Sequence, residues 1–510
     1  MKKQILVFLL YSLFMHSQQV VFKVPVNTNS LPIEKRISED LASTYSKTVY
    51  YFENDFNLKQ DLDINLPNNT IIKAIYQKSI YYSIGSYSAI YKIKNDDSGE
   101  MVLSEYGNVI TGMYVSGENK KFVFQQTATT IFAVSEINDV SFTAKEQGVD
   151  YQIDNESIDG KDALTNNDIC LSTTPICSGN TRIDIMVVYT AAASSLWGGS
   201  ATANSTITSA ITNMNVALTN SGISNISFNL VYVGLINYVE TGVFQTDLNS
   251  LKSSTDGIID EVHTLRAAYG ADLVGLILGS PTSTCGLGNL NTVSTNYVNT
   301  QAFVVNLYSC VLSNFSLAHE FGHNMGLNHD WYVNQNTFPC SHQHGYVNRT
   351  AINNGTSSTN SQRWRTIMAY DNECTDAGFN CTRINRWANP SVLYNSESTG
   401  IAIGQTNPSD EAFGFKRFAC IVSNFMATVL ENNEFDQTLF SVFPNPMKNS
   451  ITINCNFDID SVAILNAMGQ LVQKSNQKTI NTETLSAGIY FIKVYGLEGK
   501  YVGVKKVIKQ

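Results

Sequence analysis

Three histidines stand at fixed offsets within residues 318–330, which read AHEFGHNMGLNHD. His319 and His323 are four residues apart, so on a helix they lie one turn apart on nearly the same face. Two neutral imidazoles in that arrangement can bind one metal ion, and zinc accepts imidazole nitrogen readily. Glu320 follows the first histidine and would stand beside the metal, where its carboxylate can take a proton from a water molecule. The spacing therefore predicts a metal site built for hydrolysis.

The third histidine, His329, requires the predicted helix to break. It lies six residues beyond His323, and on an unbroken helix it would be turned through about 600°, away from the first two rings. Gly326 can adopt the left-handed conformation that ends a helix, which lets the chain turn back towards the metal. Three protein ligands leave a fourth position for water, as in catalytic zinc sites. A structural zinc is less favoured, because such sites are closed by four protein ligands. Three histidines that bind no metal are the other alternative.

The extended motif HEFGHNMGLNHD resembles the metzincin zinc proteases, and Asp330 after the third histidine is similar to the reprolysin or adamalysin branch of that family. The resemblance covers roughly residues 181–428, and pappalysin-like proteases share much of the motif. It implies a turn beneath the zinc that carries Met368, in RWRTIMAY. It also implies a secreted zinc-dependent endopeptidase that hydrolyses proteins through a zinc-bound water activated by Glu320. The sequence leaves a requirement for calcium open.

Other residues of the motif region have expected roles. Tyr370, two residues after Met368, resembles the tyrosine of astacins and serralysins that approaches the metal and stabilises the oxyanion; a packed core tyrosine is the alternative. Asp330 is expected to anchor the loop behind His329 rather than to act chemically. Residues 286–290 are a candidate edge strand for the backbone of a protein substrate, as the family resemblance suggests.

The composition restricts the class of protein. A chain of 510 residues is too long for one hydrophobic core and predicts several domains. With 33 Lys and Arg against 43 Asp and Glu, the net charge of −10 argues against binding a nucleic-acid backbone. Residues 1–18 contain Lys2 and Lys3 followed by an apolar run, which predicts a secretory signal peptide. No later stretch reaches about 18 uninterrupted apolar residues, so no transmembrane segment is expected.

Changes in pattern divide the rest of the chain. Residues 19–178 contain strand-like runs separated by turn residues, which predicts a β-rich domain in the position of a propeptide. In residues 179–430, strands alternate with helical segments. This alternation predicts an α/β layer with crossover connections. Together with the metzincin resemblance, it implies the fold class, an α/β metzincin-like catalytic domain with a twisted, mostly parallel sheet and helices. Residues 431–438 indicate a linker, and residues 439–510 show short strands that predict a small all-β sandwich.

The C-terminal segment carries a second resemblance. VFPNP at residues 442–446, followed by VAILNAMGQLV, LSAGIYFIKV and VGVKKVIK, resembles the C-terminal sorting domain of the type IX secretion system. The resemblance implies that the secretion machinery is a partner and that the protein is extracellular or on the outer-membrane surface. A carbohydrate-binding or adhesion sandwich is the alternative for this segment. For the whole chain, the second hypothesis is a cell-surface binding or adhesion protein with a vestigial metal site, against which the intact Glu320 argues.

The cysteines indicate disulfides and one candidate mechanism of latency. Six of the nine cysteines, from Cys285 to Cys420, surround the histidine motif and could form three bridges in 15 ways. Cys170 and Cys177 lie just before the predicted catalytic domain. A thiolate from either could bind the zinc and displace the catalytic water, which would keep a zymogen inactive. A disulfide between Cys170 and Cys177 is the preferred alternative, since export permits disulfides.

Overall fold

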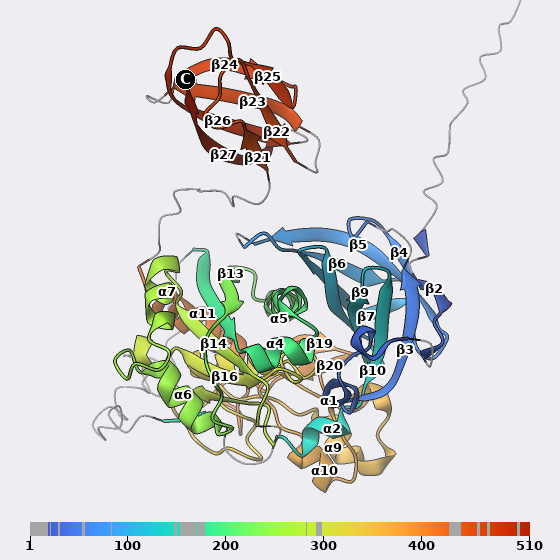
Figure 1. Ribbon diagram of the computed structural model, residues 1–510. Helices are drawn as coiled ribbons and strands as arrows, with labels where there is room; N and C mark the ends of the chain where they lie inside the picture. Colours follow the sequence, from blue (N-terminus) through green and yellow to red (C-terminus); the bar gives the residue numbers. More distant parts are fainter. Residues whose placement is uncertain are drawn as a thin grey trace, which may run out of the picture.

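The computed structural model describes residues 19–20, 22–28, 31–53, 57–82, 84–146, 150–153, 170, 179–281, 283–291, 298–427, 440–455, 459–466, 470–496 and 500–510. The predicted signal peptide and the predicted linker at residues 431–438 lie outside the described residues. Along the chain follow a large N-terminal sheet, a second sheet with the histidine-bearing helix, and a C-terminal β domain (Figure 1).

The N-terminal part is a ten-stranded sheet that is antiparallel except for the pair of β1 and β4. Short turns join its strands, and Asn95, Asn108 and Asn119 adopt positive φ angles in three of these turns, a conformation that asparagine tolerates. In spatial order its strands are β1 (Gln19–Val20), β4 (Leu62–Asn65), β5 (Ile71–Tyr81), β6 (Tyr87–Ile93), β7 (Asp96–Tyr106), β8 (Val109–Val115), β9 (Lys121–Ala128), β10 (Ile131–Ile137), β3 (Tyr45–Glu53) and β2 (Phe22–Pro25). The short helices beside it are η2 (Ile33–Lys35), α1 (Glu39–Ala42) and α2 (Val140–Thr143).

The fold class predicted from the sequence, an α/β fold with a twisted, mostly parallel sheet, is wrong. The described chain is rich in strands and has few helices, and its largest sheet is the antiparallel one, which curves like half of a barrel (Figure 1). The prediction gave most weight to the alternation of strands and helices between residues 182 and 279. Antiparallel strands joined by short turns contribute more of the regular structure than these alternating strands and helices do, because antiparallel partners need only a few connecting residues.

A mixed sheet of six strands supports the histidine-bearing helix. Strands β13, β12, β14 and β16 are parallel neighbours, β15 is antiparallel to β16, and β11 is parallel to β15 at the edge. Every residue of β14 and β16 is buried, as expected for apolar runs covered on both faces. The elements are β11 (Tyr151–Gln152), β12 (Thr181–Tyr189), α4 (Ala191–Trp197), α5 (Ser200–Asn220), β13 (Ile226–Leu235), α6 (Phe244–Lys252), α7 (Glu261–Tyr269), β14 (Leu273–Leu278), β15 (Gly286–Asn289), η4 (Asn299–Gln301), β16 (Phe303–Leu307) and α8 (Ser316–Asn324).

Helix α5 lies between the two sheets (Figure 1). It contacts β13 on one side and β7 and β8 on the other, so most of its residues are buried. Its side towards the N-terminal sheet presents hydroxyl groups. Ser205 donates to the carbonyl of Ser104 at 2.7 Å, Thr208 donates to the Ser86 hydroxyl at 3.1 Å, and the hydroxyls of Thr212 and Tyr82 are 2.8 Å apart. The contact between the two sheets through α5 is therefore partly polar.

The chain after α8 forms short elements that pack around the histidines. Strands β17 and β18 pair in parallel with Trp364 opposite Thr382 and Arg365 opposite Arg383. The elements are α9 (Arg349–Asn354), η5 (Gly355–Ser357), η6 (Asn360–Gln362), β17 (Trp364–Arg365), α10 (Asn372–Asp376), β18 (Thr382–Arg383), β19 (Asn389–Tyr394), β20 (Glu397–Thr399) and α11 (Glu411–Val422).

The C-terminal part is a separate β domain, as expected from the short strands of residues 439–510. Its three-stranded and four-stranded sheets share one apolar core, which includes Ile451 and Ile453 of β22 and Ile464 of β23. The strands are β21 (Ser441–Phe443), β22 (Ser450–Asn454), β23 (Ile459–Asn466), β24 (Leu471–Ser475), β25 (Thr479–Asn481), β26 (Gly488–Gly496) and β27 (Lys500–Lys509). Among the described residues, every helix is too short or too polar to cross a bilayer.

Candidate metal centre

Helix α8 carries the first two histidines, and the chain turns back directly after it. The helix ends at Asn324, and Gly326 has a φ angle of 79°. The N–H of Leu327 then donates to the carbonyl of Gly322 at 2.9 Å, which closes the turn. This left-handed turn, which a side chain would strain, redirects the chain so that His329 faces the helix.

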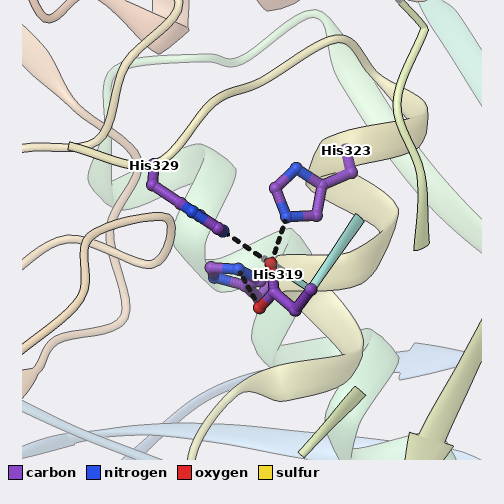
Figure 2. A group of neighbouring side chains, drawn as sticks. His319, His323 and His329 are labelled. Carbon is purple, nitrogen blue, oxygen red and sulfur yellow. Dashed lines mark hydrogen bonds and ion pairs between the residues drawn. The ribbon is translucent and has the colours of Figure 1, made fainter. Parts of the chain in front are cut away.

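The three imidazole rings converge on one point, and a carboxylate lies there. Figure 2 shows His319, His323 and His329 pointing inward to a carboxylate, which belongs to Asp150. The oxygens of Asp150 lie 3.1 Å from Nε2 of His319, 3.1 Å from Nε2 of His323 and 2.7 Å from Nε2 of His329. All three histidine side chains are at most 3% exposed. The four residues form a cluster whose ligand atoms all lie within 4.8 Å of one another.

The tautomers of the histidines suit a metal. Nδ1 of His319 lies 2.8 Å from the carbonyl of Ile367, and Nδ1 of His323 lies 2.8 Å from the carbonyl of Leu327. A carbonyl can only accept, so each Nδ1 carries the proton and each Nε2 presents a lone pair. Burial favours the neutral rings, because it lowers the pKa of His319 to about 3 and also lowers the pKa of His323.

The donor set therefore fits a divalent cation. Nε2 of His319 and of His329 are buried and make no hydrogen bond. A carboxylate that faces imidazole lone pairs is repelled unless a positive charge lies between them. Three neutral imidazoles and one carboxylate are ligands that zinc accepts in tetrahedral sites. Asp150 thus stands where a fourth ligand would be.

Glu320 lies between its helix and the edge strand β15. A Cβ atom at Gly286 would stand 2.6 Å from its carboxyl carbon, and a Cβ atom at Gly288 would stand 3.2 Å from Oε2. Glycine at both positions leaves space for the carboxyl group next to the histidines. Burial, and then the charge of Asp150, raise the pKa of Glu320 well above its usual value.

Met368 and Asp330 hold the segments around the three histidines in place. Met368 is fully buried, and a Cβ atom at Gly322 would overlap its Sδ, so the residue between the two helical histidines must be small. Asp330 accepts hydrogen bonds from the N–H of Tyr370 at 2.9 Å and from the N–H of Tyr332 at 3.1 Å. It joins the loop of the third histidine to the turn that follows Met368.

Tyr370 lies against the ligand rings. Its ring stacks on His329 with centroids 4.1 Å apart and an interplanar angle of 28°. Burial, followed by the charge of Asp150 and a hydrogen bond with it, raises the pKa of Tyr370 well above its usual value. The phenol is therefore neutral and directed at the carboxylate that the histidines surround. An open cleft of about 470 Å³ adjoins the site and is lined in part by His329 and Tyr370.

Asp150 was not predicted from the sequence; it reaches the site from the N-terminal part. Gly288 donates to the carbonyl of Asp150 at 3.0 Å, and Leu290 donates to the carbonyl of Gln152 at 2.9 Å. Strand β11 thereby adds to β15, the edge expected to take the substrate backbone, and covers it. No local pattern around Asp150 marks it as a ligand, so only the long-range pairing reveals it.

The disulfides bear on the predicted role of Cys170 in latency. Cys170 is bonded to Cys340 and not to Cys177, so it has no thiolate to offer a metal. Cys177 lies outside the described residues. The six cysteines around the motif do not pair only among themselves, because Cys340 bonds outside that group. Two further bridges are Cys285–Cys310 and Cys374–Cys381; the second leaves no free thiolate for a metal beside Asp371.

Comparisons with known proteins agree with this geometry. Residues 179–387 match a reprolysin model described as metallo-peptidase family M12, and residues 441–510 match the secretion system C-terminal sorting domain. A peptidyl-Asp metalloendopeptidase of Stenotrophomonas maltophilia (strain R551-3) is 37% identical over 227 residues, which are 44% of this chain and 49% of that protein. One of Xanthomonas campestris pv. campestris is 34% identical over 230 residues, 45% of this chain and 48% of that protein.

The chain spans about half the length of these curated relatives. Both resemblances stated from the sequence motifs, to reprolysin-type metalloproteases and to the sorting domain, are confirmed by the two family models. The matched metallopeptidase region contains the three histidines and Glu320. The chain therefore carries a metallo-peptidase domain of family M12 at residues 179–387 and a secretion system C-terminal sorting domain at residues 441–510.

Proposed function

We propose that this chain is a secreted zinc-dependent endopeptidase that is made as a latent precursor. One observation carries the proposal: three buried imidazoles direct their Nε2 atoms at one point beside the carboxyl group of Glu320, and in His319 and His323 the Nδ1 contact leaves a lone pair on Nε2. His319, His323 and His329 would hold the zinc. The bound zinc supplies Lewis acidity towards a water molecule and towards the carbonyl of the scissile bond.

The residues around the ligands carry the proton transfers and the charge. Glu320 takes a proton from the attacking water and delivers it to the leaving amine, which a buried carboxyl with a raised pKa can do. Tyr370 presents a neutral hydroxyl towards the same point and donates to the oxyanion of the substrate. Asp330 and Met368 hold the third histidine and the turn below the site in place.

The N-terminal part keeps the site closed. Asp150 fills the position that water needs, and β11 occupies the edge of β15 that a substrate backbone would use. The hydroxyl-bearing side of α5 supports removal of this part, because Ser205, Thr208 and Thr212 can hydrogen bond to water after it leaves. Residues 19–178 then act as a propeptide, residues 179–430 as the catalytic domain and residues 431–438 as a linker.

Secretion follows from the C-terminal domain. The sorting domain at residues 441–510 supports passage through the type IX secretion machinery to the outside of the cell or its surface. The enzyme would encounter its protein or peptide substrates outside the cell or at its surface. The curated relatives are named peptidyl-Asp metalloendopeptidases, and we extend this to the chain by proposing that it cleaves bonds next to aspartate.

A hydrolysis assay tests the proposal against a surface-binding protein with a vestigial metal site. The secreted and processed protein should hydrolyse casein, a chelator should abolish the hydrolysis, and zinc should restore it. Glu320→Ala should lower the rate by about 10²- to 10⁴-fold, the usual contribution of a general base, while the metal content stays unchanged. If the processed wild-type protein with bound zinc hydrolyses no protein substrate, the surface-binding alternative stands.

A further inference from the structure

Two buried arginines lie side by side near the turn of Met368. Arg365 and Arg383 are opposite each other on the parallel strands β17 and β18, and their side chains are 3% and 1% exposed. Arg365 donates to the carbonyl of Ala369 at 2.5 Å, and Arg383 donates to the same carbonyl at 3.3 Å. Because Ala369 directly follows Met368, the arginine pair is hydrogen-bonded to the turn that lies beneath the metal site.

The carboxylate between these arginines belongs to the N-terminal part. Nη2 of Arg365 lies 2.8 Å from Oε2 of Glu146, and Nη2 of Arg383 lies 3.1 Å from Oε1. Asn314 donates to Oε1 at 2.7 Å. Burial alone would raise the pKa of Glu146, but the two arginines outweigh it and lower the pKa to about 2. Glu146 is therefore a fully ionised, buried anion.

After the N-terminal part leaves, the two arginines would lose the carboxylate that pairs with both of them. Lys121 and Asp139 of that part pair with each other at 2.5 Å, and Glu146 is the carboxylate of that part that forms ion pairs with both arginines. Among the described residues outside that part, Asp371 also pairs with an arginine, with Oδ1 3.9 Å from Nε of Arg365. A buried cation without a partner is strongly destabilising. The vacated position thus favours a new carboxylate.

One segment reaches both the arginines and the histidines. Glu146 and Asp150 are four residues apart, and four residues of extended chain span at most about 14 Å. The N–H and carbonyl groups of β15 hold the end of this segment. A peptide that crosses the metal site can therefore place one of its side chains between the two arginines.

We propose that Arg365 and Arg383 form the subsite that recognises an acidic side chain of the substrate, and that Glu146 fills this subsite in the precursor. The proposal rests on the proposed peptidase function and assigns residues to its substrate preference. Two guanidinium groups and Asn314 offer fixed hydrogen-bond donors to a carboxylate. Aspartate and glutamate provide a carboxylate, whereas the side chains of asparagine and glutamine carry no negative charge. The N-terminal part then blocks the enzyme twice, with Asp150 at the metal and Glu146 at the specificity subsite.

Peptide hydrolysis tests the assignment. The secreted and processed protein is given peptides that differ only in one residue, Asp, Glu, Asn or Ala, placed in turn on either side of the scissile bond. At one position, kcat/KM for Asp should exceed that for Asn by about 30-fold or more, because a charged subsite rejects a ligand that leaves its donors unpaired. In Arg383→Gln and Arg365→Gln this ratio should fall to about 3-fold or less, with kcat/KM for the Asn peptide little changed.

Two further variants separate recognition from folding. Arg383→Lys keeps the charge but not the planar fork, so it should retain the preference for Asp over Asn at a reduced ratio. Arg386→Gln is the matched control, because Arg386 belongs to the same segment but donates to the carbonyl of Asn220 and stacks on Tyr394. It should keep the wild-type ratio. An Asp-to-Asn ratio that is the same in wild type, Arg365→Gln and Arg383→Gln overturns the proposal.

A binding measurement distinguishes failure of the subsite from failure of the peptidase function. The secreted and processed Glu320→Ala variant is titrated with fluorescently labelled Asp and Asn peptides, and the Kd values are read from anisotropy without any hydrolysis. If the Asp peptide binds more tightly than the Asn peptide, and if adding Arg383→Gln removes this difference, the subsite is supported even if no variant hydrolyses protein. Equal Kd values for both peptides contradict the subsite, whatever the hydrolysis assay shows.

Discussion

The carboxylate of Asp150 lies 2.7 Å from Nε2 of His329, although 179 positions separate the two residues along the chain. This contact joins the N-terminal part to the residues expected to hold the metal. The same carboxylate also lies 3.1 Å from Nε2 of both His319 and His323. A single side chain thus occupies the place that hydrolysis requires for water.

Asp150→Asn should weaken the latency of the full-length chain. The neutral amide is a poorer metal ligand than a carboxylate, so water should enter the site more readily. We expect hydrolysis by the uncleaved chain to rise by about 10-fold or more, given the 10- to 100-fold losses typical of weakened metal-site partners. Asp63→Asn, an acid of β4 in the ten-stranded N-terminal sheet, is the control. Intact mass is checked to show that the chain is uncleaved.

Cys170→Ser provides the matching test of the earlier cysteine hypothesis. Because Cys170 is bonded to Cys340, its removal should leave the uncleaved chain inactive. Activation by Cys170→Ser and not by Asp150→Asn would assign latency to a thiolate instead.

His323→Ala should abolish metal binding by the secreted protein. Loss of one imidazole leaves a two-histidine site, so the zinc content measured by elemental analysis should fall from about one ion per chain to near zero. His263→Gln should retain the ion, since His263 lies at the carbonyl of Leu251, outside the cluster. Equal zinc contents in both variants would place the metal elsewhere.

Gly322→Ala should destabilise the fold by about 1–3 kcal/mol, the usual cost of overpacking. The added methyl group would overlap Sδ of Met368 and stand 3.2 Å from the ring of Trp387. Urea unfolding measures the change. In a Met368→Ala background the same substitution should cost less, because the overlapping atom is gone. An equal loss of unfolding free energy in both backgrounds would mean that the added methyl group does not clash with Met368.

The stability of the chain should depend on pH through Glu411. This residue of α11 is fully buried, and burial raises its pKa from 4.5 to about 8. Since the folded-state pKa lies above the unfolded value, its contribution to stability is complete below pH 4.5 and is lost as pH rises through about 8. Relative to Glu411→Gln, which keeps an acceptor for the N–H of Ala388, the wild type should lose unfolding free energy across that range.

Urea unfolding at several pH values provides the measurement for Glu411. Glu261→Gln, at an exposed position of α7, is the control and should follow the wild-type profile. A stability difference between wild type and Glu411→Gln that stays constant from pH 4.5 to pH 8 would contradict the raised pKa.

The histidine motif could be predicted from the sequence because its geometry depends on local features, namely helix periodicity and a glycine turn. His323 follows His319 by four positions, which is about one helical turn, and Gly326 permits the left-handed turn that brings His329 back. The short apolar strands of the C-terminal domain were readable for a similar reason, since alternation and turn residues are local features.

The tertiary structure alone decided which residues close the site and which surround it. Asp150 and Glu146 reach the histidines and the arginine pair only because β11 pairs with the strand β15, which lies more than a hundred positions away along the chain. The same holds for the bond of Cys170 with Cys340 and for the dominance of the antiparallel N-terminal sheet. Pairing between distant strands depends on how whole surfaces pack, and no short stretch of sequence contains that information.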